Sequence, residues 1–153
     1  KSGAAVVTQP GFIHWNGPSY RKNVDPSLQS YLYAIGAIQN AGVPVAFGSD
    51  GPVINPDPWP AIHSAVTRQD REGQQFPEAN GSSRVSIQSA LRMYTLSGAE
   101  LEGTAQEKGS ISPGKLADLV LVDADPLTID PDGLKDIKAK MTMVGGKVVW
   151  ERR

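Results

Sequence analysis

The stretch from Gly42 to Val53, which reads GVPVAFGSDGPV, constrains the fold of this chain more than any other. Its apolar run Val43–Phe47 is short and ends at Gly48, with the Gly51-Pro52 turn close behind, a pattern typical of a fully buried strand. Asp50 follows the run, and α/β barrels and open α/β sheets carry their chemistry at the carboxyl ends of strands. Spacing alone is equally compatible with a turn-forming or capping role for Asp50.

Length and composition limit the classes of protein to which this chain can belong. At 153 residues, 39% of them hydrophobic, the chain is long enough for one domain with a real core. Its formal net charge of −1 argues against nucleic acid and against an anionic membrane as partners. No apolar run approaches the roughly 20 residues of a membrane span. The first residues show no secretory leader pattern, and we expect a cytoplasmic protein.

Two residue types limit the chemistry that the chain can perform by itself. It contains no cysteine, which excludes disulfides, thiolate metal sites and a cysteine nucleophile. It contains two histidines, His14 and His63, which are far apart in the sequence. A histidine-rich metal site therefore cannot be assembled from this chain alone.

The first part of the sequence predicts a βαβ unit. Ala4–Thr8 is a candidate buried strand, and Phe12–Val24 after it is predicted to be a loop whose aromatic and polar groups suit a pocket. Asp25-Pro26 is typical of a helix start, and Gly42 stands where a helix would end. The strand Val43–Phe47 follows at once, so the two strands are expected to be parallel.

Two further helices are predicted after the proline-rich passage that follows Asp50. The first begins at Pro60 and runs to about Arg71. The segment Glu72–Ser83 is rich in Gly, Gln and Ser and is predicted to be an exposed loop. Ser86 then caps a second helix that ends near Gly103.

From Gly109 onward the pattern changes to short strands and turns. We predict strands over Leu116–Asp123 and Ile137–Val144, then a hairpin turn at Gly145-Gly146 and a returning strand over Lys147–Trp150. The chain thus has an α/β part, residues 1–103, and an all-β part, residues 104–153. Neither is expected to be complete, because two parallel strands or three to four sandwich strands need further strands for stability.

Three passages together resemble the amidohydrolase superfamily, and most of all its YtcJ-type branch, amidohydrolase family 3. They are Val43–Asp50, the helix region Arg84–Thr95, and the glycine-containing run Lys108–Val120; the closing Val144–Val149 fits as well. The resemblance covers essentially the whole chain but only about the last third of such an enzyme.

The resemblance implies an α/β fold, namely the last part of a TIM-like (β/α)8 metal-dependent hydrolase barrel beside a composite β-sandwich. Val6–Thr8 would then be strand seven, Val43–Phe47 strand eight, and Gly109–Trp150 the returning half of the sandwich. The family's earlier His-x-His, its bridging ligand and its histidines on strands five and six are absent here. We therefore expect this chain to be one part of a larger molecule.

The resemblance also implies a function for Asp50, which ends strand eight. In the family that acid binds the metal and takes a proton from the attacking water. We expect hydrolysis of C–N bonds in amides or cyclic amides, with a divalent metal, zinc, whose other ligands lie outside this chain. The expected partners are a small-molecule substrate and the remainder of the barrel or a second copy of the chain. The alternative is a non-catalytic remnant that self-associates and acts as a binding module.

Other polar residues receive weaker assignments. His14 and Trp15 are candidates for substrate contact, with a surface or packing role as the alternative for His14. His63 is predicted to be structural. Arg68 and Arg71 are predicted to lie on a solvated helix face, with a structural salt bridge as the alternative for Arg68.

Two acids elsewhere in the chain are predicted to be structural, although the first invites a functional interpretation. Asp118 lies within an apolar strand of the sandwich, and we expect a hydrogen-bonded turn or a strand-pairing role. Asp57 lies next to a proline and is typical of a turn acid.

Overall fold

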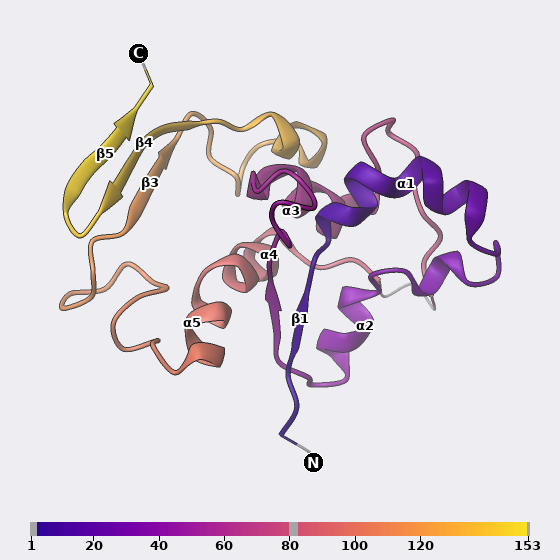
Figure 1. Cartoon of the computed structure of the whole chain (residues 1–153), viewed down its shortest axis with the longest axis horizontal. Helices are drawn as coiled ribbons and strands as arrows, with labels where there is room; N and C mark the ends of the chain where they lie inside the picture. The colour runs from indigo at the N-terminus through magenta and orange to yellow at the C-terminus, as the bar shows by residue number, and fades with distance from the viewer. Residues whose placement is uncertain (1–2, 80–82, 153) are drawn as a thin grey trace.

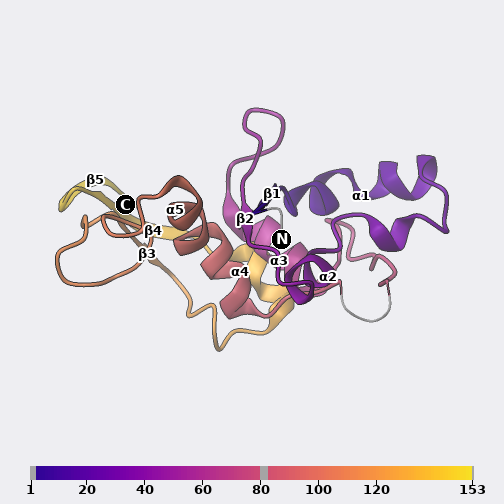
Figure 2. The same ribbon diagram turned by 90° about the horizontal axis from the view of Figure 1, so that it is seen from below.

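A computed structural model describes residues 3–79 and 83–152, and Figure 1 shows the course of the chain through them. The helices gather around two short strands, β1 (Val6–Thr8) and β2 (Val45–Phe47). Three further strands form a separate sheet at the end of the molecule opposite to helix α1 (Figures 1 and 2). None of the described helices is long and apolar enough to cross a lipid bilayer.

Strands β1 and β2 confirm the predicted parallel pair. Val7 lies opposite Ala46, and the register continues to Thr8 opposite Phe47. All residues of β2 are buried, as expected for the apolar run, whereas Val7 on β1 is 61% exposed. Within the described residues this sheet has two strands, so one edge of each strand is unpaired.

Helix α1 (Gly11–Asn23) occupies the segment that was predicted to be a loop, so that prediction is wrong. Glycine and proline are typical of turns and loops, so the glycines and the internal Pro18 of this segment favoured a loop in the sequence. The glycines fit in this helix because α1 packs so closely on its neighbours that side chains at their positions would clash. A Cβ on Gly17 would stand 2.4 Å from the Cβ of Asp70, and a Cβ on Gly11 would stand 2.7 Å from Ile54.

The single helix predicted between Asp25 and Gly42 is broken in the structure. It consists of a 3-10 turn, η1 (Gln29–Tyr31), and a short helix α2 (Ile35–Asn40), while the Asp25 carboxylate accepts the backbone N–H of Ser27 at 2.8 Å. Gly42 follows α2 with φ +72°, as predicted for a helix end.

The break is a tertiary effect that involves Arg68. Its guanidinium donates hydrogen bonds to the carbonyls of Leu32 and Tyr33 at 2.9 and 3.1 Å. These carbonyls would otherwise serve the backbone ladder of a continuous helix.

The next helix, α3 (Pro58–Thr67), begins earlier and ends earlier than predicted. It begins earlier because Asp57 caps it, accepting the N–H of Trp59 at 3.1 Å, so this acid is a helix cap rather than only a turn residue. It ends at Thr67 because Arg68 adopts the left-handed conformation, with φ +60°.

The predicted exposed loop after α3 is exposed at residues 72–75 and 77, but it is buried at Phe76 and Ser83. Phe76 is 1% exposed and lies under the guanidinium of Arg21, 5.0 Å from its carbon to the ring centroid. Arg21 also forms an ion pair with the buried Asp70. The exposed-loop prediction is therefore wrong for Phe76, and residues 80–82 of that loop lie outside the described residues.

Helix α4 (Ile87–Tyr94) and helix α5 (Leu96–Glu102) follow local sequence rules. The hydroxyl of Ser86 accepts the N–H of Ser89 at 3.1 Å, which confirms the predicted cap. Gly103 ends α5 with φ +77°, also as predicted, although Thr95 separates the two helices.

The C-terminal sheet is antiparallel, with the strand order β3-β4-β5. Its strands are β3 (Leu119–Val122), β4 (Ala139–Val144) and β5 (Lys147–Glu151), each close to a predicted strand. Gly145 and Gly146, with φ +55° and +78°, make the predicted hairpin turn. The carboxylate of Asp118 accepts the N–H of Gly145 at 2.7 Å, which confirms its hydrogen-bonded turn role.

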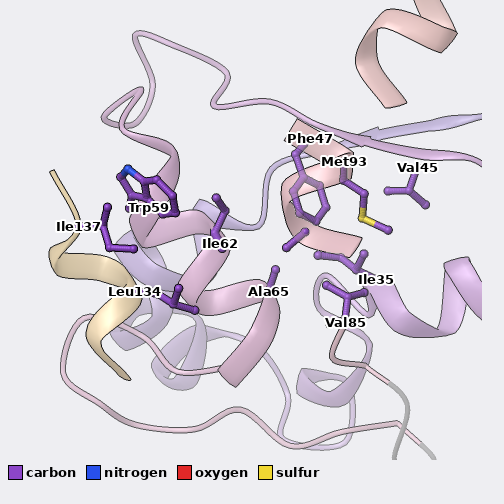
Figure 3. Close-up of a cluster of buried hydrophobic side chains, with 11 residues drawn as sticks. Ile35, Val45, Phe47, Trp59, Ile62, Ala65, Val85, Met93, Leu134 and Ile137 are labelled. Atoms are coloured by element: carbon purple, nitrogen blue, oxygen red, sulfur yellow. The ribbon is translucent and has the colours of Figure 1, made fainter. Parts of the chain in front are cut away.

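An apolar cluster joins both parts of the chain. Figure 3 shows Trp59, Ile62 and Ala65 of α3 between β2 on one side and Leu134 and Ile137 on the other. Leu134 belongs to a 3-10 helix that was not predicted, η2 (Pro131–Asp136), and it is fully buried against α3. Residues on both sides of position 103 therefore contribute to the same core.

Candidate active-site edge

Asp50 stands at the carboxyl edge of the parallel pair. The N–H of Gly48 donates to the carbonyl of Thr8 at 3.0 Å, which ties the ends of β2 and β1 together. Asp50 follows in a tight turn, in which its carbonyl accepts the N–H of Val53 at 2.8 Å. The segment between β2 and α3 projects from the body of the molecule (Figure 2). The carboxylate is therefore presented outward from the edge where α/β folds carry their chemistry.

The backbone of Asp50 is held in an uncommon conformation. Its φ is +55°, in the left-handed region, which aspartate tolerates better than most residues because its short polar chain bonds locally. The side chain is exposed. Such a carboxylate is free to take a ligand.

The described residues do not complete a metal centre around Asp50. No group of three or more His, Asp or Glu side chains in the described part of the chain is placed to hold a metal ion. Asp50 fits the position of one oxygen ligand, and a zinc site needs about three protein ligands. Any metal at this edge must take its other ligands from residues beyond those described.

A second group of residues starts from the same edge. The connection from β1 to α2 covers residues 9–34 and contains α1 and η1, and Figure 1 shows α1 beginning where β1 ends. Within it, the rings of Tyr20 and Tyr33 stack with centroids 6.2 Å apart, and Phe12 meets the Tyr33 ring edge-on at 6.0 Å. The two tyrosine hydroxyls lie 3.2 Å apart.

This aromatic group lies within reach of the Asp50 charge. Burial raises the pKa of Tyr33 well above its ordinary value, and the contact with the Tyr20 hydroxyl and the negative charge of Asp50 raise that pKa further. The Tyr33 hydroxyl therefore stays protonated at neutral pH. Sequence analysis missed Tyr33 because its surroundings fit the pattern of a helix, and no local signal marks it.

His14 and Trp15, the predicted substrate contacts, lie on α1 as neighbours. His14 is 6% exposed and faces α3, with its ring 4.9 Å from that of Trp15 and 6.2 Å from that of His63. This is the packing position that the sequence offered as the alternative for His14. Trp15 is partly buried.

His63, predicted to be structural, is fully buried on α3. Its Nε2 lies 3.9 Å from a carboxylate oxygen of Asp132, and neither ring nitrogen has a hydrogen-bond partner among the described residues. Burial, the positive charge of Lys135 and the neighbouring His14 lower its pKa to about 4. The pKa of His14 is lowered too, by burial and by Lys135 and Arg71. Both histidines are therefore neutral at neutral pH.

Arg68 does not lie on a solvated face, so that prediction is wrong. It is 2% exposed, and it donates to three backbone carbonyls, including that of Pro77 at 3.0 Å. A buried guanidinium needs several acceptors, and these carbonyls supply them in place of the carboxylate of a salt bridge. Arg71 is exposed as predicted, but it lies in a turn after α3 rather than on the helix.

Comparison with known proteins places these features in a family. The amidohydrolase family matches residues 1–150. The putative amidohydrolase YtcJ of Bacillus subtilis is 29% identical over 148 residues, which are 97% of this chain and 28% of that protein. An N-substituted formamide deformylase from Arthrobacter pascens is 32% identical over 121 residues, which are 79% of this chain and 22% of that enzyme. The chain thus spans less than a third of these relatives.

Solved structures agree with this assignment. An uncharacterised metal-dependent hydrolase from Pyrococcus furiosus aligns with a TM-score of 0.63 and 26% identity, over 82% of this chain and 25% of that one. An adenosine deaminase from Xanthomonas campestris with bound zinc aligns with a TM-score of 0.62 and 25% identity, over 94% of this chain and 31% of that one.

Proposed function

Because the chain belongs to the amidohydrolase family, we propose that it is part of a metal-dependent hydrolase of C–N bonds, in which Asp50 is a metal ligand and the general base. The names of two relatives support the choice of bond, since a formamide deformylase and an adenosine deaminase both cleave bonds between carbon and nitrogen. The zinc in the second of these supports zinc as the metal.

The position of Asp50 is the observation that carries the proposal. Its exposed carboxylate stands directly after the buried strand β2, at the edge shared with the end of β1. Asp50 would hold a metal ion at this edge, and such an ion would lower the pKa of a bound water toward ~7. The Asp50 carboxylate accepts the proton of the attacking water and returns it to the leaving nitrogen.

The other metal ligands are proposed to lie on residues that this chain does not contain. Two surfaces support this part of the proposal. Val7 on β1 is 61% exposed beside an unpaired strand edge, and Val149 on β5 is 60% exposed on a sheet whose last strand is exposed throughout. We assign the first surface to the remainder of a (β/α)8 barrel and the second to the other half of a composite β-sandwich.

The test compares two acids in the complete hydrolase that carries the remaining ligands. Asp50→Asn removes the base and weakens the metal bond, so we expect turnover of an N-formyl amine to fall at least about a hundredfold, with loss of bound zinc. Asp25→Asn is the matched control, because Asp25 is exposed and an asparagine oxygen can still accept the N–H of Ser27. Full activity of the Asp50→Asn enzyme would exclude the proposal.

The chain by itself provides a second measurement. We expect the 153-residue chain to hold no stoichiometric zinc and to show no turnover, because its described residues offer one ligand at this edge. Tightly bound zinc with turnover by the isolated chain would contradict the assignment of the other ligands.

A non-catalytic module that self-associates is the second candidate, and the C-terminal sheet favours it. Val148, Val149 and Trp150 on β5 are 51%, 60% and 47% exposed, which is unusual for a sheet that packs only within its own chain. The chain has a mass of 16.3 kDa, so sedimentation of the isolated chain separates monomer from dimer. This candidate predicts a dimer that Val149→Lys dissociates, and a monomeric wild type would exclude it.

A further inference from the structure

Three non-glycine residues of the described chain have an uncommon backbone conformation. Among the described residues, the non-glycine residues with positive φ are Tyr33, Asp50 and Arg68, at +47°, +55° and +60°. A bulky residue such as tyrosine rarely adopts this region, and such outliers tend to cluster at functional sites, where the surrounding structure holds them. Two of them are in contact, because Arg68 binds the carbonyl of Tyr33, and Tyr33 and Asp50 stand on the connections that leave the paired ends of β1 and β2.

Tyr33 is held from several sides. Arg68 fixes its backbone through the carbonyls of Leu32 and Tyr33 itself, at 2.9 and 3.1 Å. The Phe12 ring meets the Tyr33 ring edge-on, and the Tyr20 ring stacks on it with an interplanar angle of 29°. The ring is thus fixed in place although its side chain is only partly buried.

The hydroxyl of Tyr33 is suited to donating a hydrogen bond. It lies 3.2 Å from the hydroxyl of Tyr20, and one proton between the two oxygens satisfies that contact. When Tyr20 donates this proton, the proton of Tyr33 is free for a ligand. Burial keeps the pKa of Tyr33 above its ordinary value, so the group does not act as a base at neutral pH.

The connection that carries both tyrosines arises at the edge where Asp50 stands. Thr8 and Phe47 are paired in register at the ends of β1 and β2, and residues 9–34 leave from that end. In barrel enzymes, the connections at the carboxyl ends of the strands line the substrate pocket. A substrate held at Asp50 would therefore meet this connection.

We propose that Tyr33 binds the substrate of the site at Asp50, donating its hydroxyl proton to the carbonyl oxygen of the amide, and that Tyr20 positions it. The inference rests on the proposed function and adds the group that holds the carbonyl. A donor of this kind is most valuable when the carbonyl oxygen becomes negative in the transition state, so it acts mainly on kcat.

The experiment uses Tyr33→Phe in the complete hydrolase, with an N-aryl formamide as the substrate. The variant keeps the ring contacts and loses only the hydroxyl, and we expect kcat to fall about 10- to 100-fold while KM changes little. Tyr31→Phe is the matched control, because Tyr31 is 68% exposed in η1 and should leave kcat unchanged. Thermal unfolding of each variant reports whether the fold is preserved.

The role of Tyr20 is tested with a double variant. Because Tyr20 acts through Tyr33, Tyr20→Phe alone should lower kcat, and the pair Tyr20→Phe/Tyr33→Phe should be no slower than Tyr33→Phe. A purely structural role would instead make the two effects multiply.

The outcomes separate this inference from the function on which it rests. Loss of turnover in Asp50→Asn together with normal kcat in Tyr33→Phe would overturn the role of Tyr33 and leave the function intact. Normal turnover in Asp50→Asn would overturn the function itself.

Discussion

Acid should destabilise this protein through His63. The ring is fully buried between α3 and η2, and its pKa is lowered from 6.5 to about 4 by burial, by Lys135 and by His14. Asp132 and Asp136 on η2 oppose this shift, but they do not cancel it. Between these two pH values the unfolded chain therefore binds a proton that the folded chain excludes.

The magnitude follows from the shift. A pKa unit corresponds to about 1.4 kcal/mol, so complete protonation of the buried ring costs about 3 kcal/mol. The stabilising contribution of neutral His63 is fully present above pH 6.5 and is lost as the pH falls toward about 4. Between about pH 7.5 and about pH 5 the free energy of unfolding should fall by about 2 kcal/mol. His14 adds to the loss, because its pKa is lowered as well.

The assay is urea unfolding of the chain at these two pH values, followed by tryptophan fluorescence. Trp59 lies in the core and Trp15 contacts His14, so the signal reports on this region. His63→Leu replaces the ring by an apolar side chain of similar size and should remove most of the pH dependence. His14→Phe/His63→Leu should remove the rest of the histidine contribution, because the chain has two histidines.

Two results would refute this reasoning. One is a wild-type protein that is equally stable at both pH values. The other is a His63→Leu variant that keeps the full wild-type loss on acidification, which would assign the effect to carboxylates elsewhere.

Three further substitutions test the fold by the same urea assay. Arg68→Met keeps an apolar stem like that of arginine but leaves the carbonyls of Leu32, Tyr33 and Pro77 without their donor. It should lower the free energy of unfolding by about 3 kcal/mol, and an unchanged stability would contradict the role given to this buried guanidinium. Gly17→Ala should lower the free energy of unfolding by about 1–3 kcal/mol, because the new Cβ would stand 2.4 Å from that of Asp70. Gly98→Ala, inside α5 with nothing within 4 Å, should instead raise it by about 0.5–1 kcal/mol. Equal effects at the two positions would be evidence against the close approach of α1. Ser86→Ala should lower the free energy of unfolding by about 1 kcal/mol, because α4 loses its N-terminal cap. Ser86→Asp retains an acceptor and should keep most of the wild-type stability. If Ser86→Asp is as unstable as Ser86→Ala, the capping hydrogen bond does not explain the loss.

The elements that local rules govern were predictable from the sequence. The buried strand before Asp50, the Ser86 cap, the helix end at Gly103 and the Gly145-Gly146 hairpin each depend on a few adjacent residues. Backbone conformation and capping hydrogen bonds act over one turn of chain, so the residues that decide them are neighbours in the sequence.

The predictions that were wrong concern segments whose conformation depends on contacts between residues distant in the sequence. In helix α1, position 17 requires glycine because Asp70, far along the chain, occupies the space that a Cβ would need. The predicted helix before β2 breaks where Arg68 takes the carbonyls of Leu32 and Tyr33. In both cases the residue that decides the conformation, Asp70 or Arg68, lies outside the segment, so the pattern of the segment alone could not predict it.

In the candidate site, too, the sequence predicts one part and the tertiary structure decides the other. The sequence by itself determined where Asp50 stands, because a short buried run followed by a Gly/Pro turn places the acid at the end of a strand. Only the tertiary structure decided what surrounds it. Tyr33 and Tyr20 meet because the chain after α1 returns through η1 to bring Tyr33 beside α1, and His14 is buried because α1 packs on α3. The physical reason is that a strand end depends on its own residues, whereas burial and hydrogen bonding between side chains depend on which segments the fold brings together.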